Sequence, residues 1–236
     1  MPSVVESVRQ ELIAKSDQAT KQSFNRFFKE NVSYYGVKTT VVRRIAAKFW
    51  SEIRACSKAE VFALCEELYR SGVTEEATVA ALWLPNLADV FEPSDLEMFR
   101  NWIEKYVDNW AKCDTLCNHT IGSLVEKFPA YAAELKSWAK SGNRWLRRAA
   151  AVTLIIPAKR GDFLQEAFDI SSVLLRDEDD MVQKGYGWLL KEESRMHQQQ
   201  VFDFVKKNKQ NMPRTALRYA IELMPKKLKA QLMRKD

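Results

Sequence analysis

Helical periodicity runs through almost all of this 236-residue chain and limits its fold more than any other feature. Apolar residues recur three or four positions apart, as with Val4, Val8 and Leu12, and this spacing places them on one face of a helix. Only 7 Gly and 7 Pro interrupt the pattern, whereas an all-β protein needs many tight turns. No segment alternates convincingly as a strand does. The sequence therefore predicts an all-α protein.

The expected helices are short and are separated by short polar joints. We expect them at residues 4–15, 57–70, 75–91, from Pro93 and from Pro129 onward, and at 143–156, 162–175, 179–194, 197–208 and 213–224. Ser57 and Glu60 form a possible capping box, and Pro85 predicts a break within residues 75–91. The basic stretch from Lys226 to Lys235 is expected to fray.

Repeated helix pairs of this size are typical of an α-solenoid, in which each pair buries its apolar face against its neighbours. The loose period, roughly 35–45 residues, resembles HEAT-like repeats. We find no linker and therefore expect a single domain over residues 1–236. In such a stack one helix of each pair lines a concave face.

Three tryptophan-anchored clusters fit this period. They contain Trp110 with Asp114, Trp145 with Arg148, and Lys184 with Trp188, and they begin 35 and 39 residues apart. Each ring lies about one helical turn from a charged group. Equivalent helices would bring all three clusters to one groove. Spacing alone favours a place in the core for the three rings, because aromatic side chains dominate helix packing.

The charge balance and the cysteine content restrict the partners and the compartment. The net charge of +6 suits a polyanionic partner, although solubility alone could also explain it. The N-terminus lacks the features of a signal peptide, and no run approaches a membrane-spanning length. We therefore expect a cytoplasmic protein with its four cysteines free. Cys113, Cys117 and His119 lack the second ligand pair that a zinc site needs, so no metal is expected.

Several short motifs, in this order and spacing, resemble the AlkD-like DNA alkylation repair family, the HEAT-like-repeat DNA glycosylases. The motifs are residues 35–39, Arg43 and Arg44, Trp110 with Asp114, residues 143–150, residues 183–190 and residues 214–218. The resemblance covers most of the chain. In residues 109–114 it departs from the family, because one tryptophan stands where some relatives have two, and Lys112 and Cys113 are uncommon neighbours.

The resemblance implies a monofunctional glycosylase that hydrolyses the N-glycosidic bond of 3-methyladenine or 7-methylguanine in duplex DNA, without a metal or cofactor. It implies that Asp114 is the catalytic carboxylate and that Trp110 and Trp188 form aromatic walls around the sugar of the lesion. It also implies that Arg148 holds the DNA backbone, whereas Trp145 is expected to serve packing. Further candidates for phosphate contacts are Arg43, Arg44, Arg147, Lys184, Arg214 and Arg218.

Two other functions remain open at this stage. One is a catalytically silent relative that binds damaged or branched DNA, and the presence of Asp114 argues against it. The other is a protein-interaction solenoid, which would show no salt-dependent affinity for DNA. We expect a monomer without an obligate protein partner, because one groove suffices for one lesion.

Overall fold

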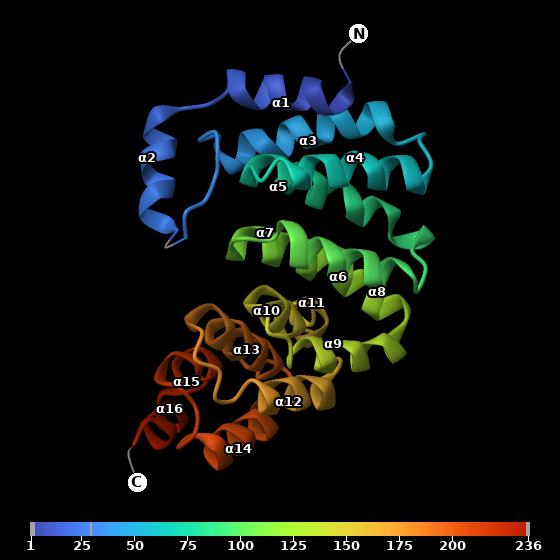
Figure 1. Ribbon diagram of the computed structural model, residues 1–236. Helices are drawn as coiled ribbons and strands as arrows, with labels where there is room; N and C mark the ends of the chain where they lie inside the picture. The colour runs from blue at the N-terminus through green and yellow to red at the C-terminus, as the bar shows by residue number, and fades with distance from the viewer. Residues whose placement is uncertain (1–2, 29, 235–236) are drawn as a thin grey trace. The chain divides into compact units, whose positions relative to one another are not determined.

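Helices make up most of the residues that the computed structural model of this chain describes, 3–28 and 30–234, with the side chains of residues 25–27 left aside (Figure 1). No β-strand forms within these residues, where a single isolated bridge joins Ser33 and Val73. The all-α prediction is confirmed, and consecutive helices pack on one another as in a HEAT-like α-solenoid. Lys235, at the end of the stretch expected to fray, lies outside the described residues.

The helices gather into two compact units, Met1–Leu116 and Cys117–Asp236. The expectation of a single domain over residues 1–236 stays a prediction. None of the described helices is both long enough and apolar enough to cross a membrane.

Unit 1 consists of helices on either side of one short 3₁₀ segment. They are α1 (Val4–Ala14), α2 (Gln18–Phe27), α3 (Thr39–Ile53), α4 (Lys58–Arg70), α5 (Thr74–Trp83), η1 (Leu84–Val90), α6 (Asp95–Tyr106) and α7 (Trp110–Thr115). Helix α5 packs between α3 and α4, and the fully buried Trp83 ties it to α3 because its indole N–H donates to the Ala46 carbonyl at 2.8 Å. Figure 1 shows α2 lying crosswise at one end of α3 and α5.

Unit 2 begins within a π-helical turn. Its elements are η2 (Leu116–Ile121), α8 (Gly122–Lys127), η3 (Pro129–Tyr131), α9 (Ala132–Trp138), α10 (Arg144–Val152), α11 (Ile155–Ala158), α12 (Leu164–Val173), α13 (Asp180–Glu193), α14 (Gln198–Asn208), α15 (Arg214–Ala220) and α16 (Lys226–Met233). Helix α13 is central and packs on α10, α12 and α15. A Cβ at Gly187 would lie 2.8 Å from the Ala216 carbonyl oxygen, so the approach of α13 to α15 requires a glycine there.

Local capping and proline signals explain most helix boundaries. Ser57 and Glu60 form the expected capping box of α4. Pro85 lies in the first turn of η1, where the α-helical geometry of α5 ends. The helix expected at 143–156 is divided into α10 and α11. The basic stretch from Lys226 forms α16 rather than fraying, because Leu232 is buried against the rest of unit 2.

One buried acid on α13 makes stability depend on pH. Glu193 is fully buried, and neither of its carboxyl oxygens has a hydrogen-bond partner within the described part of the chain. Burial raises the pKa of Glu193 from 4.5 to about 8, with a further increase from the charges of Asp162 and Glu166.

We predict that the free energy of unfolding depends less on pH in Glu193→Gln than in the wild type, because Gln does not titrate. Between pH 4.5 and 8 the unfolded chain releases this proton while the folded chain keeps it, so the free energy of unfolding falls by up to about 1.4 kcal/mol per pH unit. Urea unfolding at pH 5 and at pH 7.5 should show a smaller fall for Glu193→Gln than for the wild type. The exposed Glu178→Gln is the control, and equal falls in all three proteins would contradict the assignment.

Candidate functional site

Helix α7 is fixed at its first turn by buried polar groups. Asn109 caps the helix, and its side chain accepts the backbone N–H of Lys112 at 3.1 Å. The Lys112 side chain is buried and donates to the Gly72 carbonyl at 2.6 Å and to Asp108 at 2.9 Å. Lys112 therefore has a structural role, because it ties the first turn of α7, which begins at Trp110, to the Gly72 carbonyl.

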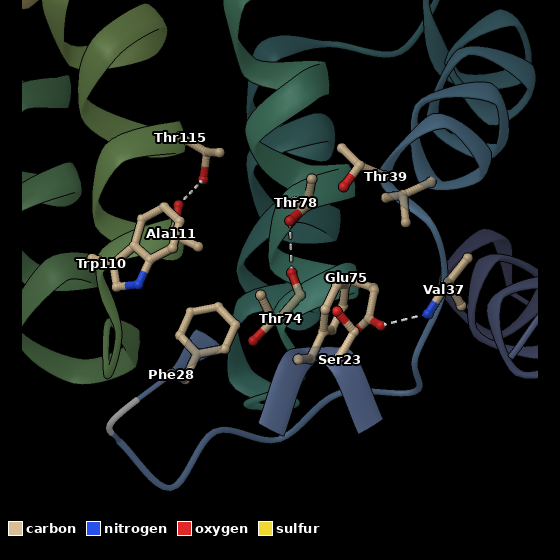
Figure 2. A pocket seen from close by; sticks show the side chains of 12 residues that line it. Ser23, Phe28, Val37, Thr39, Thr74, Glu75, Thr78, Trp110, Ala111 and Thr115 are labelled. Carbon is tan, nitrogen blue, oxygen red and sulfur yellow. Dashed lines mark hydrogen bonds between the residues drawn. The ribbon is translucent and has the colours of Figure 1, made fainter. Parts of the chain in front are cut away.

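A cavity of about 350 Å³ opens beside Trp110 within unit 1 (Figure 2). Its walls come from α2, from the turn before α3, and from α3, α5 and α7. The lining residues are Ser23, Phe24, Phe28, Val37, Thr39, Val42, Thr74, Glu75, Thr78, Trp110, Ala111 and Thr115. A mostly apolar cavity with a few polar groups is the usual form of a small-molecule site.

Aromatic rings form one wall of the cavity. Phe28 stacks on the half-buried Trp110, with ring centroids 5.5 Å apart and an interplanar angle of 28°. Phe24 meets Phe28 edge-on at 6.5 Å and Tyr34 at 5.4 Å. Phe24 and Phe28 were not among the site residues expected from the sequence, although their four-residue spacing was a usable signal.

The turn before α3 is held by a buried carboxylate. Glu75 accepts three successive backbone N–H groups, those of Tyr35 at 3.2 Å, Gly36 at 2.8 Å and Val37 at 3.0 Å. Gly36 has a φ of 91°, and a Cβ there would lie 2.9 Å from the Asp17 carbonyl oxygen. Glu75 therefore fixes the backbone that places Val37 in the cavity wall (Figure 2).

The neighbouring carboxylate, Glu76, fastens the same turn to α1. Glu76 is fully buried and receives two hydrogen bonds from Arg9, each 3.0 Å long, and one from the Tyr35 hydroxyl at 2.5 Å. This pairing raises the pKa of the Arg9 guanidinium, whereas burial, followed by the bond to Glu76, raises the pKa of Tyr35. Two adjacent acids on α5 thus stabilise the turn, Glu75 through backbone N–H groups and Glu76 through the Tyr35 hydroxyl.

The predicted catalytic carboxylate lies one helical turn beyond Trp110. Asp114 is half-buried on α7 and is not among the lining residues, which on this helix are Trp110, Ala111 and Thr115. The helix then widens into the π-helical η2, and such turns are frequent near functional sites. The structure therefore places Trp110 in a cavity wall, while the catalytic role of Asp114 stays a prediction.

The remaining tryptophans lie in unit 2. Trp188 is half-buried on α13, and its indole N–H donates to Glu192 at 3.0 Å. Trp145 is only 6% exposed, and the Arg144 guanidinium lies 4.7 Å from the centroid of its ring. The expectation that Trp145 serves packing agrees with this burial. The role of Trp188 as an aromatic wall stays a prediction.

The cations expected to hold DNA fall into two groups. Three of them have partners inside unit 2: Arg147 pairs with Asp177 at 2.6 Å, Lys184 pairs with Asp180 at 2.9 Å, and Arg148 is 5% exposed and donates to the Met181 carbonyl. The other four are exposed, namely Arg43, Arg44, Arg214 and Arg218. Their DNA contacts stay predictions, and the exposed group has the accessibility that phosphate contacts require.

The possible metal ligands of the sequence do not form a site. Cys113 and Cys117 are buried and His119 is exposed. Within the described residues no three side chains of the His, Cys, Asp or Glu types come together as a metal site would require.

The fold and the cavity define an all-helical repeat protein with an aromatic-walled cavity, and Asp114 lies one helical turn beyond the cavity residue Trp110. A family model described as DNA alkylation repair enzyme matches residues 8–224, and the chain belongs to that family. The match spans both units and includes every residue discussed above as a site candidate.

A solved structure supports the fold. It is described as a predicted DNA alkylation repair enzyme from Enterococcus faecalis, and the two chains share 17% identity with a TM-score of 0.80. The similarity covers 90% of this chain and 98% of the other. No curated protein matches this chain significantly.

We predict that Glu75→Ala lowers the free energy of unfolding by at least about 2 kcal/mol. The change removes the acceptor of three backbone N–H groups, and each buried donor left without a partner costs about 1–3 kcal/mol. Urea unfolding measures the loss, and hydrogen exchange at residues 35–37 should quicken. Glu67→Ala, at an exposed position of α4, is the matched control. A loss no larger than that of the control would show that Glu75 does not hold the turn.

Proposed function

We propose that this protein is a monofunctional DNA glycosylase that removes cationic alkylated purines, such as 3-methyladenine and 7-methylguanine, from duplex DNA. The observation that carries the proposal is the arrangement on α7, where Trp110 forms a cavity wall and Asp114 follows one turn later. Membership of the DNA alkylation repair enzyme family supplies the substrate class. We also propose that it acts as a cytoplasmic monomer.

The proposed reaction needs few protein groups. Alkylation at N3 or N7 gives the purine a positive charge, so the base leaves as a neutral molecule with the electron pair of the glycosidic bond. Water forms the new bond to the sugar C1′ and loses a proton. The transition state resembles an oxocarbenium ion, as in glycoside hydrolysis. A nearby carboxylate stabilises that positive charge and orients the water.

Asp114 is our candidate for this carboxylate, with Trp110 and Trp188 as aromatic partners. A ring face attracts a cation by about 0.5–2 kcal/mol, depending on how completely water is excluded. A factor of ten in rate corresponds to about 1.4 kcal/mol. One carboxylate and two rings thus suffice for a moderate acceleration of a bond that alkylation has already weakened. The same groups accelerate cleavage of a neutral nucleotide much less, because its base carries no positive charge.

The stacking of Phe28 on Trp110 in the cavity wall supports this role for the ring. A stacked partner fixes the plane of the indole before any substrate arrives, and a preorganised group loses less entropy on binding. The internal partners of Arg147, Arg148 and Lys184 instead favour a structural role for these three side chains. The rival function is a relative that binds damaged DNA without excision.

We predict that Asp114→Asn reduces base release at least about 100-fold, because it removes the charge that stabilises the transition state. The assay follows release from a duplex with a single 7-methylguanine under single-turnover conditions, with binding to the undamaged duplex measured in parallel. Binding should stay within about twofold, because charge repulsion between one carboxylate and the backbone is weakened by salt.

The control is Asp203→Asn, which makes the same charge change at an exposed position of α14. Equal excision by all three proteins would contradict the role of Asp114. If the wild type releases neither 7-methylguanine nor 3-methyladenine but binds the duplex, the silent DNA-binding relative replaces the glycosylase.

We predict that Trp110→Ala slows release of 7-methylguanine at least about tenfold while changing affinity for undamaged duplex much less, since the ring acts on positive charge at the lesion. Trp50→Ala is the matched control, because Trp50 is also half-buried in unit 1 and lines another hollow. Circular dichroism confirms that both variants fold. Parallel losses of excision and of duplex binding would mean that Trp110 serves only packing.

A further inference from the structure

The positive charge of this protein is concentrated at one end of the chain. Residues 206–236 contain 10 Lys and Arg against 2 Asp and Glu, a net charge of +8. The remaining residues contain 27 against 29, a net charge of −2. The basic character of the whole protein therefore comes from its last 31 residues.

Three cations near the start of α13 are paired with carboxylates. The acidic run before α13 supplies Asp177 to Arg147, Asp179 to Arg144 and Asp180 to Lys184, at 2.6, 2.8 and 2.9 Å. A polyanion could engage these cations only in competition with carboxylates that already hold them. That competition weakens their value as the main phosphate contacts.

Three C-terminal arginines differ from these cations near the start of α13. The one acidic residue among residues 206–234 is Glu222, and it pairs with Lys191 of α13 at 2.9 Å. Within the described chain no carboxylate pairs with Arg214, Arg218 or Arg234, and all three are exposed. Arg214 and Arg218 lie four residues apart on α15, where like charges repel each other unless an anion lies between them.

Two of these arginines, Arg214 and Arg234, also line a hollow of about 480 Å³. Lys209 after α14, Arg214 at the start of α15 and Arg234 after α16 line it, and no acidic side chain of the described residues does so. The Lys209 ammonium donates to the Arg234 carbonyl at 3.2 Å, which ties two of these segments together. The hollow thus gathers three cations from three separate elements.

We propose that residues 206–234 form a phosphate-backbone anchor for duplex DNA, which we name the C-terminal anchor. This inference rests on the proposed function for the identity of the polyanion. The anchor provides affinity independent of sequence and of damage, because it neutralises phosphates and releases their counterions. Its role is to hold the duplex, while recognition of the lesion falls to Trp110 and Asp114.

The test combines Arg214→Gln, Arg218→Gln and Arg234→Gln in one protein and measures Kd for an undamaged duplex at several salt concentrations. Each lost phosphate contact lowers the slope of log Kd against log salt by about 0.9, so the slope should fall by about 2 to 3. Affinity at low salt should weaken about tenfold or more.

Two matched proteins isolate the effect. Lys105→Gln, Lys140→Gln and Lys159→Gln remove the same charge from exposed positions elsewhere and should leave the slope within about 1 of the wild type. Arg→Lys changes at the three anchor positions keep the charge and should keep the slope. An anchor variant that binds DNA with the slope of the wild type would overturn the proposal.

Excision and lipid binding separate this inference from its rivals. If the wild type releases no alkylated base but the Gln changes still reduce the slope, the glycosylase fails and the anchor stands. If the wild type excises and the slope does not change, the function stands and the anchor fails. Binding to vesicles of anionic lipid that depends on the same three arginines, without any effect on DNA, would assign the surface to a membrane and overturn the proposal.

Discussion

The candidate site depends on two adjacent buried carboxylates of α5. Glu75 receives the backbone N–H groups of residues 35–37, and Glu76 receives Arg9 of α1. A buried charge is tolerated only when it is paired and hydrogen-bonded. Here the hydrogen bonds that Glu75 and Glu76 accept fix the backbone conformation of residues 35–37. That turn leads from α2 into α3 and so sets one wall of the cavity beside Trp110.

The distribution of charge supports the proposed division between recognition of the lesion and attachment to DNA. In unit 2, carboxylates pair with Arg147 and Lys184, whereas the net positive charge of the sequence comes from residues 206–236. A search for rare lesions benefits from this division, since attachment independent of sequence lets a protein slide along the duplex. In the proposed mechanism, Trp110, Trp188 and Asp114 then act only where a base carries positive charge.

Local features of the structure could be predicted from the sequence, whereas distant pairings could not. The capping box of Ser57 and Glu60 was predictable because its two residues lie three positions apart. The partners of Glu75 and Glu76 lie 38 to 67 residues away, and no periodicity shows such a pairing. The neutralisation of Arg147 by Asp177, across 30 residues, and the stacking of Phe28 on Trp110 likewise depend on tertiary packing.

Selectivity for cationic bases is the central claim, and the spectrum of bases released from methylated duplex DNA tests it most directly. Chromatography of the released bases should show 3-methyladenine and 7-methylguanine, which are cationic as nucleosides, and no O6-methylguanine, which is neutral. Release of the neutral base at a comparable rate would contradict the electrostatic account of the site. Release of no base at all would contradict the glycosylase itself.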